Sequence, residues 1–244
     1  MSFAYGKFRQ SPKNDWLRVD EKLQSEKATH YILNYQHTEN DRIFRIETYY
    51  KKYEDLVKFT NGDASLLTNN GSGYAKGVEL FWRDNKSLRN VDYWLSYSFL
   101  DTKRDYLNFP DQAIPSFASK HNFSAVYKHF VQEMKSQLGF TYSYASGRPY
   151  FNPNDTKFNS DRTPYDTDLS FNWSYLPKPN LIIYFSCTNL LGRDNVFNYE
   201  YSNKLNEDNA YNSRAVMQPA KRFLFIGIFL TLTKDKSVNQ LPTL

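Results

Sequence analysis

Bulky apolar and polar side chains alternate along most of the chain. In VDYWLSYSF, residues 91–99, the odd positions hold Val, Tyr, Leu, Tyr and Phe, whereas the even positions include Asp and two Ser. Successive side chains of a β-strand point to opposite faces of a sheet, so a two-residue period indicates a strand with one apolar face. No helical period is sustained over a comparable stretch. The pattern therefore predicts an all-β protein.

The same alternation recurs in about ten segments, and the connections between them alternate in length. The segments lie in residues 3–10, 29–37, 42–51, 78–82, 91–99, 121–129, 134–144, 168–175, 181–188 and 222–232. The short connections fall near residues 40–41, 84–90, 131–133 and 176–180, and the long polar ones at 12–26, 60–73, 102–118, 148–164 and 192–218. Strands joined in this way run antiparallel, with every long connection at the same edge. We expect an antiparallel up-and-down meander of about ten strands, each paired with its neighbours in sequence.

The apolar faces of these strands favour contact with lipid. Tyr and Phe supply much of the apolar content, since aromatic residues make up 18% of the chain. Six aromatic residues end the apolar faces, as the interfacial girdles of a membrane barrel require: Tyr97, Phe99, Tyr142, Tyr144, Trp173 and Tyr175. A soluble β-sandwich also alternates, because one sheet face packs on a core. A soluble all-β binding module that uses its aromatic rings as sugar platforms therefore remains an alternative.

Charge and cysteine content narrow the classes of protein further. The net charge of +5 is spread over 31 basic and 26 acidic residues without a basic stripe, so we expect no nucleic-acid partner. The single cysteine, Cys187, excludes an intramolecular disulfide and a multi-cysteine zinc site. No apolar run approaches the roughly 20 residues of a spanning helix, and MSFAYGKFRQ does not have the pattern of a signal peptide.

The longest apolar run, RFLFIGIFLTL, occupies residues 222–232 near the C-terminus. Its even positions from 224 to 232 hold only Leu and Ile, which predicts a final, lipid-facing strand. Phe223, Phe225 and Phe229 fall on the opposite face, so we expect something to pack against that inner face. The sequence thus divides into a barrel segment, residues 1–232, and a polar tail, residues 233–244. It leaves open whether the strands form an open half-barrel or close into a small ring.

Four segments resemble the C-terminal β-barrel portion of TonB-dependent outer-membrane receptors, in the order of that family. They are YAKGVELFW (74–82), YSYASGRPY (142–150), TDLSFNWSY (167–175) and CTNLLGRDNVFNYEYS (187–202). In addition, Gly227 followed by Leu230 and Leu232 resembles the C-terminal signal read by the outer-membrane assembly machinery. In the second and fourth segments, Gly147, Pro149, Asn189 and Gly192 stand where strands are expected to end.

The resemblance implies an outer-membrane location in a Gram-negative-type cell and a barrel filled by a plug domain. Family members take up scarce nutrients, such as siderophores or cobalamin, with energy passed from TonB. The chain has no segment that resembles a plug or a TonB-contact region. We therefore expect a fragment with a structural and ligand-vestibule role. Its partners would be membrane lipid, a plug and the remaining barrel strands, a small nutrient ligand at the outer loops, and TonB only through a missing N-terminal part.

The sequence predicts no catalytic, cofactor-binding or metal-binding residue, and no enzyme. His30 and His37 have opposite strand parity, and His121 and His129 lie about 26 Å apart along one strand. The loop at residues 152–168 is rich in Asp and Asn, the oxygen ligands of calcium, but it does not have the spacing of an EF-hand.

One enzymatic alternative remains, a small ten-stranded barrel of the omptin protease type. Asp101 and His121 would lie near the outer ends of neighbouring strands, where such a pair could activate water. A matching second acidic pair is not evident in the sequence.

Overall fold

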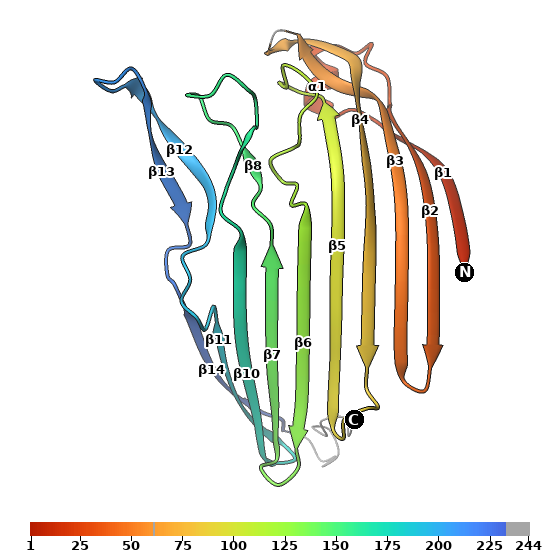
Figure 1. Ribbon diagram of the computed structural model, residues 1–244, viewed down its shortest axis with the longest axis vertical. Coiled ribbons are helices and arrows are strands. Elements are labelled where there is room, and N and C mark those ends of the chain that lie inside the picture. Colours follow the sequence, from red (N-terminus) through yellow and green to blue (C-terminus); the bar gives the residue numbers. More distant parts are fainter. Residues whose placement is uncertain (61, 233–244) are drawn as a thin grey trace.

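The main body of the protein is one curved antiparallel sheet of ten strands (Figure 1). The computed structural model describes residues 1–60 and 62–232, so the predicted polar tail lies outside the described residues. The strands, in the order in which they pair, are β1 Ser2–Gln10, β2 Glu26–Glu39, β3 Arg42–Thr60, β4 Asp63–Asp84, β5 Val91–Asp105, β6 His121–Val131, β7 Ser136–Ala145, β10 Asp166–Lys178, β11 Leu181–Thr188 and β14 Phe223–Leu230. The predicted meander is confirmed.

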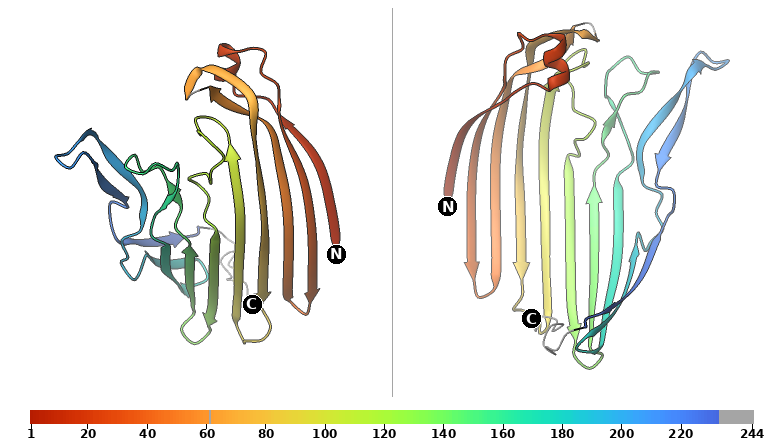
Figure 2. Two further views of the ribbon diagram at one scale, coloured as in Figure 1. Left: turned by 45° about the horizontal axis from the view of Figure 1, so that its top comes forward. Right: turned by 180° about the vertical axis from the view of Figure 1, so that it is seen from behind.

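The smaller elements all lie in the long connections (Figure 2). They are the helix α1 Asn14–Val19, the short pair β8 Pro149–Tyr150 and β9 Asp161–Arg162, and the hairpin of β12 Val196–Leu205 and β13 Tyr211–Met217. Among the described helices, none has the length and apolar content needed to span a membrane.

The sheet is an open, curved wall. Its pairing order begins at β1 and ends at β14, and these two edge strands do not pair with each other in the described structure. The four short turns lie at one end of the wall and the long connections at the other (Figure 1). The ten strands therefore form an open half-barrel here, and the small closed ring left open by the sequence is not what the structure contains.

Two strands run further than their apolar pattern indicates. The segment at residues 60–73, expected to be a long loop, is mostly the start of β4, which pairs with the end of β3 through Lys58↔Thr68 and Phe59↔Leu67. Ladder pairing uses backbone groups, so it continues where the side chains no longer alternate between apolar and polar. The prediction of a long loop at residues 60–73 was therefore wrong. These residues instead extend the β3–β4 hairpin beyond the rest of the wall.

A small apolar cluster supports that projecting hairpin. Val57 is fully buried, and it packs with Leu23 and Leu67. The ring of Trp16 in α1 meets Phe59 edge-on, with 6.4 Å between the ring centroids. The helix thus anchors the hairpin at the long-loop end of the wall.

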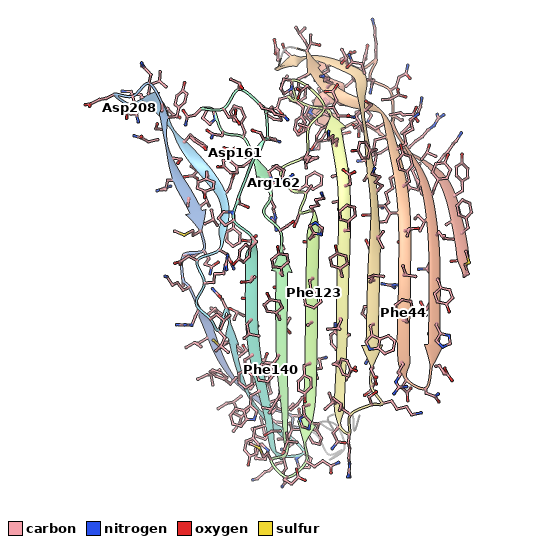
Figure 3. All side chains as sticks on the ribbon, viewed as in Figure 1. Phe44, Phe123, Phe140, Asp161, Arg162 and Asp208 are labelled. Atoms are coloured by element: carbon pink, nitrogen blue, oxygen red, sulfur yellow. The ribbon has the colours of Figure 1, made fainter. Side chains whose placement is uncertain are left out.

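The predicted aromatic residues lie on the apolar face, the face that holds the rings of the odd positions of β5. Phe99, Tyr142 and Tyr144 lie on the halves of β5 and β7 nearer the long loops, and Tyr97 lies at the middle of β5. Trp173 and Tyr175 lie toward the short turn that follows β10. The rings of Trp173 and Tyr175 stack, with centroids 5.9 Å apart. Figure 3 shows further rings along the strands, with Phe44, Phe123 and Phe140 on β3, β6 and β7. Rings of the apolar face therefore lie at several heights along the strands.

The last strand has the two-faced character that its sequence predicts. Leu224, Ile226 and Ile228 pair with residues of β11 on the apolar face, and they are between 62% and 72% exposed. Phe225 and Phe229 lie on the other face, where both rings are exposed. Within the part of the chain that the structure describes, both faces of β14 are therefore largely exposed.

Candidate functional site

The face of the wall opposite the apolar one is polar and hollowed. A cavity of about 550 Å³, called here the inner cavity, lies over β3 to β10. Its polar lining consists of small or hydrogen-bonding side chains and a few charges: Ser96, Ser98, Asn122, Ser124, Ser143, Arg45, Glu79, Arg148, Asp166 and Asp168. Except for Arg148, which lies between β7 and β8, these residues occupy the polar positions of each strand's two-residue period. The same alternation that forms the apolar face therefore also lines the cavity.

Oppositely charged groups gather where the inner cavity meets the long connections. The Nε atom of Arg148 and the Oδ1 atom of Asp166 are buried without a hydrogen-bond partner among the described residues. Asn195 secures the start of β10 nearby, since its side chain accepts from the Thr167 amide at 3.2 Å and donates to the Thr167 carbonyl at 2.9 Å. Buried polar atoms without partners are uncommon in proteins, so this region is suited to receive a further polar group.

A second hollow, called here the loop pocket, lies among the long connections and has a volume of about 1040 Å³. Aromatic rings dominate its lining: Phe59, Phe109, Tyr150, Phe151, Phe158, Tyr199 and Tyr201. The amides of Asn108, Asn159 and Asn198 add hydrogen-bonding groups. The cation in its lining, Lys58, is neutralised by an ion pair with Asp105. A hollow that combines aromatic rings with hydrogen-bonding side chains can serve as a small-molecule site.

Ring contacts hold the loop pocket together. The ring centroids of Phe109 and Phe158 are 4.8 Å apart, and so are those of Tyr150 and Tyr199. Burial, together with a hydrogen bond to Tyr201, raises the pKa of the Tyr150 hydroxyl well above its ordinary value. Tyr150 is therefore neutral at every physiological pH and can serve the pocket as a hydrogen-bonding group.

Side-chain amides tie the loops to one another. Asn159 donates to the Ile114 carbonyl at 3.2 Å, which links two successive long connections. Asn154 bonds Tyr211 of β13 twice, as donor to its carbonyl at 2.9 Å and as acceptor from its amide at 2.7 Å. Three separate long connections are thus held as one unit around the pocket.

We expect acid to loosen one of these loops. Asp155 accepts hydrogen bonds from the Ser160 hydroxyl and the Lys157 amide, and these bonds lower the pKa of its carboxyl below the ordinary 3.8. A lowered pKa means that the carboxylate stabilises the loop above pH 3.8 and that this contribution is lost as the pH falls through the folded-state value. Hydrogen exchange at the Lys157 amide, measured between pH 6 and pH 2.5 and corrected for intrinsic rates, should show reduced protection only below about pH 4. Protection that is the same in Ser160→Ala as in the parent at pH 6 would contradict this role of Asp155.

The four histidines do not come together. The ring of His30 packs on Phe8, with 4.6 Å between centroids, and His37 lies at the other end of β2 beside Glu39. His121 and His129 lie at the two ends of β6. Within the part of the chain that the structure describes, no group of three or more His, Cys, Asp or Glu side chains is placed to hold a metal ion.

Asp101 and His121, considered above as a possible acid–histidine pair, have separate partners. Asp101 accepts from the Tyr74 hydroxyl at 3.3 Å and pairs with Lys76 at 3.2 Å. His121 shares a hydrogen bond of 2.9 Å with the Tyr97 hydroxyl. His121 pairs with Phe99 in the β5–β6 ladder, so Asp101 lies two residues further along β5 than the partner of His121. Both side chains lie on the apolar face rather than in the inner cavity.

The polar side chains of the Asp- and Asn-rich loop considered for calcium are engaged by other protein groups, within the loop and in neighbouring connections. Asp161 accepts from the Asn152 amide at 2.7 Å, and Asp155 is engaged by Ser160. Ser170 donates to Asp168 in β10. Sequence reasoning did not find the loop pocket that this loop helps to form, because the connections were interpreted as polar. Their high density of Phe and Tyr, as in residues 106–117 and 150–165, is the signal that could have indicated it.

Comparison with known proteins supports the architecture. A family model described as "TonB dependent receptor-like, beta-barrel" matches residues 2–190. Among solved structures, the chain is similar to the FrpB iron transporter of Neisseria meningitidis (F3-3 variant), with a TM-score of 0.69 and 11% identity over 93% of this chain and 35% of that one. It is also similar to the ferric-catecholate import receptor Fiu of E. coli K12, with a TM-score of 0.62 and 13% identity over 93% of this chain and 32% of that one.

A third similar structure is the outer-membrane ferripyoverdine receptor of Pseudomonas aeruginosa, with a TM-score of 0.64 and 9% identity over 92% of this chain and 30% of that one. The chain therefore spans about a third of the length of these solved structures. No protein of curated function matches it. Because the family model covers strands β1 to β11 and the fold agrees, the chain belongs to the TonB-dependent receptor β-barrel family of the Gram-negative outer membrane.

Proposed function

We propose that the chain forms part of the barrel wall and of the ligand vestibule of an outer-membrane nutrient-uptake receptor. The observation that supports this is the position of the loop pocket at the long-loop end of the wall, next to the inner cavity. Phe197 lines the inner cavity and Asn198, the next residue, lines the loop pocket. A ligand held among the loops would thus be adjacent to the polar inner face along which it would pass.

The chemistry of the two hollows favours a small, ring-bearing nutrient such as a metal chelate or cobalamin. The loop pocket offers aromatic faces and amides, with its lining Lys58 already paired. The inner cavity offers both signs of charge, including Arg148 and Asp166. Two similar solved structures are by name receptors for ferric-catecholate and ferripyoverdine, and we extend this ligand class to the present chain as a proposal.

We further propose that a plug domain and additional barrel strands cover the surfaces that are open here. Phe225 and Phe229 expose their rings on the inner face, and the edges of β1 and β14 have no partner strand among the described residues. Exposed strand edges and apolar rings of this kind are normally covered in a folded assembly. TonB would act through the plug part of such an assembly and not through the wall. No contact in the described structure favours the omptin-type enzyme, since Asp101 and His121 have separate partners.

Removing two rings of the loop pocket is expected to weaken ligand binding at least tenfold. Phe158 and Tyr199 both line the pocket and contact other rings there. Each buried aromatic contact contributes about 1 kcal/mol, and 1.4 kcal/mol corresponds to a factor of ten in affinity. Equilibrium binding of a ferric catecholate, ferric citrate and cobalamin to the purified chain in mild detergent would be compared between the parent and F158A/Y199A.

Tyr35→Ala is the control, because it removes a ring that is 45% exposed on the apolar face of β2, away from the loops. We expect at least one probe to bind the parent and the Tyr35→Ala variant equally and the double variant more weakly. If none of the three probes binds, the proposed ligand class is wrong. If the double variant binds as the parent does, the proposed position of the site is wrong.

A further inference from the structure

Three charged side chains gather where the inner cavity borders the long connections. They are Arg148 between β7 and β8, Asp166 at the start of β10 and Arg193 between β11 and β12, called here the charge triad. Arg148 and Asp166 line the inner cavity. Both guanidinium groups lie within electrostatic range of the Asp166 carboxyl. The triad thus brings together three segments that are separate in the sequence.

Hydrogen bonds tie the segment that carries Asp166 to both arginines. The Thr163 amide donates to the Arg148 carbonyl at 2.9 Å, and the Arg148 amide donates to the Thr163 hydroxyl at 3.0 Å. The Nη2 atom of Arg193 donates to the Tyr165 carbonyl at 3.0 Å, and its guanidinium lies 3.9 Å from the Tyr165 ring centroid. The three charges are therefore positioned by the fold itself, which lowers the ordering cost of binding a ligand there.

The charges of the triad lie near one another without being paired. The arginine ion pairs within 4.0 Å in the described part of the chain involve neither Arg148 nor Arg193. The Nε atoms of both arginines and the Oδ1 atom of Asp166 are buried without a hydrogen-bond partner among the same residues. Burial of a charge is costly unless an opposite charge or a hydrogen bond compensates for it. The triad is therefore suited to a ligand group that supplies both signs of charge.

The rest of the inner cavity suits a molecule of amino-acid size. Its volume of about 550 Å³ is typical of small-molecule sites. The rings of Phe81 and Phe197 and the hydroxyls of Ser96 and Ser124 also line it. An apolar side chain of a ligand could thus contact rings of the same cavity that its charged head enters.

We propose that the charge triad binds an α-amino-acid head of the nutrient, in which a carboxylate and an ammonium lie close together. Arg148 takes the carboxylate, since its guanidinium donates to none of the residues that the structure describes. Asp166 takes the ammonium, and Arg193 adds a second positive charge. A guanidinium can bind a carboxylate through two parallel N–H···O bonds. This inference rests on the vestibule proposed above, because it assumes that the nutrient passes through the inner cavity.

A ligand with only one of the two charges fits the triad less well. A carboxylate alone would pair with Arg148 and leave Asp166 unpaired, whereas an ammonium alone would leave Arg148 unpaired. A site built to pair a polar group discriminates against analogues without that group, because its own buried partner is then left unsatisfied. The triad should therefore select for the complete head.

Three forms of one amino acid test this assignment. L-Phenylalanine has both charges, N-acetyl-L-phenylalanine has only the carboxylate, and L-phenylalanine amide has only the ammonium. Their dissociation constants for the purified chain in mild detergent would be measured by ligand-observed NMR near neutral pH, with empty micelles as the blank. We expect L-phenylalanine to bind the parent at least tenfold more tightly than either blocked form.

Two substitutions separate the two ends of the head. Asp166→Asn should weaken the binding of L-phenylalanine at least fivefold without weakening that of the N-acetyl form. Arg148→Gln should weaken the binding of L-phenylalanine by a similar factor without weakening that of the amide form. The matched controls are Arg162→Gln and Asp208→Asn, which remove exposed charges on β9 and in the β12–β13 turn (Figure 3). Both controls should bind all three probes as the parent does.

Equal binding of the three probes to the parent, or binding of none of them, would overturn the proposal. So would a loss that is the same for all probes in Asp166→Asn and Arg148→Gln, because damage to the fold does not distinguish the two ends of the head. Ferric-probe binding that depends on Phe158 and Tyr199, together with equal binding of the three amino-acid probes, would overturn the amino-acid head alone. Selective binding of L-phenylalanine without that dependence would instead contradict the position of the vestibule.

Discussion

Gly77→Ala is expected to destabilise the sheet by about 3 kcal/mol, because the central strands leave no room for a methyl group there. A Cβ atom at this position would lie 2.3 Å from the backbone oxygen of Phe99 and 2.6 Å from the hydroxyl of Tyr49. The first of these atoms belongs to the neighbouring strand's backbone, so relief requires the β4–β5 pairing to shift. Urea unfolding of the chain in detergent, followed by tryptophan fluorescence, measures the change.

Gly139→Ala provides the matched control on β7. Its added Cβ would meet atoms of Asn172, the nearest at 2.5 Å, all of them on a side chain that can rotate away. We expect this variant to lose about 1 kcal/mol or less. Equal unfolding midpoints for the two variants would contradict the close approach of the backbone at Gly77.

Asn189→Ala is expected to cost about 3 kcal/mol at the outer end of β11. Its buried side chain donates to the Arg193 carbonyl at 2.7 Å and to the Lys221 carbonyl at 2.6 Å, and it accepts from the Arg193 amide at 3.1 Å. Its backbone has a φ of 48°, a conformation that asparagine tolerates better than alanine. The variant would lose three hydrogen bonds, remove a partner from the Arg193 amide and from the Lys221 carbonyl, and add backbone strain.

The control for this substitution is Asn209→Ala, which separates strain from hydrogen bonding. Asn209 has a similar φ of 54° but is exposed, and it lies in the turn of the β12–β13 hairpin. Unfolding by urea should show a loss of about 1 kcal/mol or less for this variant. If both asparagine variants lose the same stability, the hydrogen bonds of Asn189 do not hold the end of β11 to the segment before β14.

The order and pairing of the ten strands could be predicted from the sequence because each strand has one apolar face. In residues 91–99 the two-residue period alone fixes which side chains face lipid, and the observed ladder agrees. The two-residue alternation of apolar and polar side chains stops where the apolar face of the wall ends. It therefore gave no indication that β4 begins at Asp63 or that residues 196–217 form a hairpin, since backbone pairing outside the band does not require an apolar face.

The position and lining of the loop pocket could not be predicted for a different reason. The loop pocket combines rings from connections far apart in the chain, such as Phe59, Phe109 and Tyr199, and their proximity depends on how the loops fold over one another.

The strand register separates Asp101 from His121, the pair considered for an omptin-type enzyme. Parity places both side chains on the same face, but only the ladder shows that His121 lies opposite Phe99.

The most direct test of this account is a nitroxide scan along β5 in a lipid bilayer. In the membrane, one face of the wall must contact hydrocarbon and the other must face water. In a Cys187→Ser background, single cysteines at residues 93–98 would be spin-labelled, and the accessibility of each label to oxygen and to a water-soluble nickel chelate measured. We predict high oxygen accessibility at positions 93, 95 and 97 and high nickel accessibility at 94, 96 and 98. Uniform accessibility, or alternation of the opposite phase, would contradict the placement of this wall in the outer membrane.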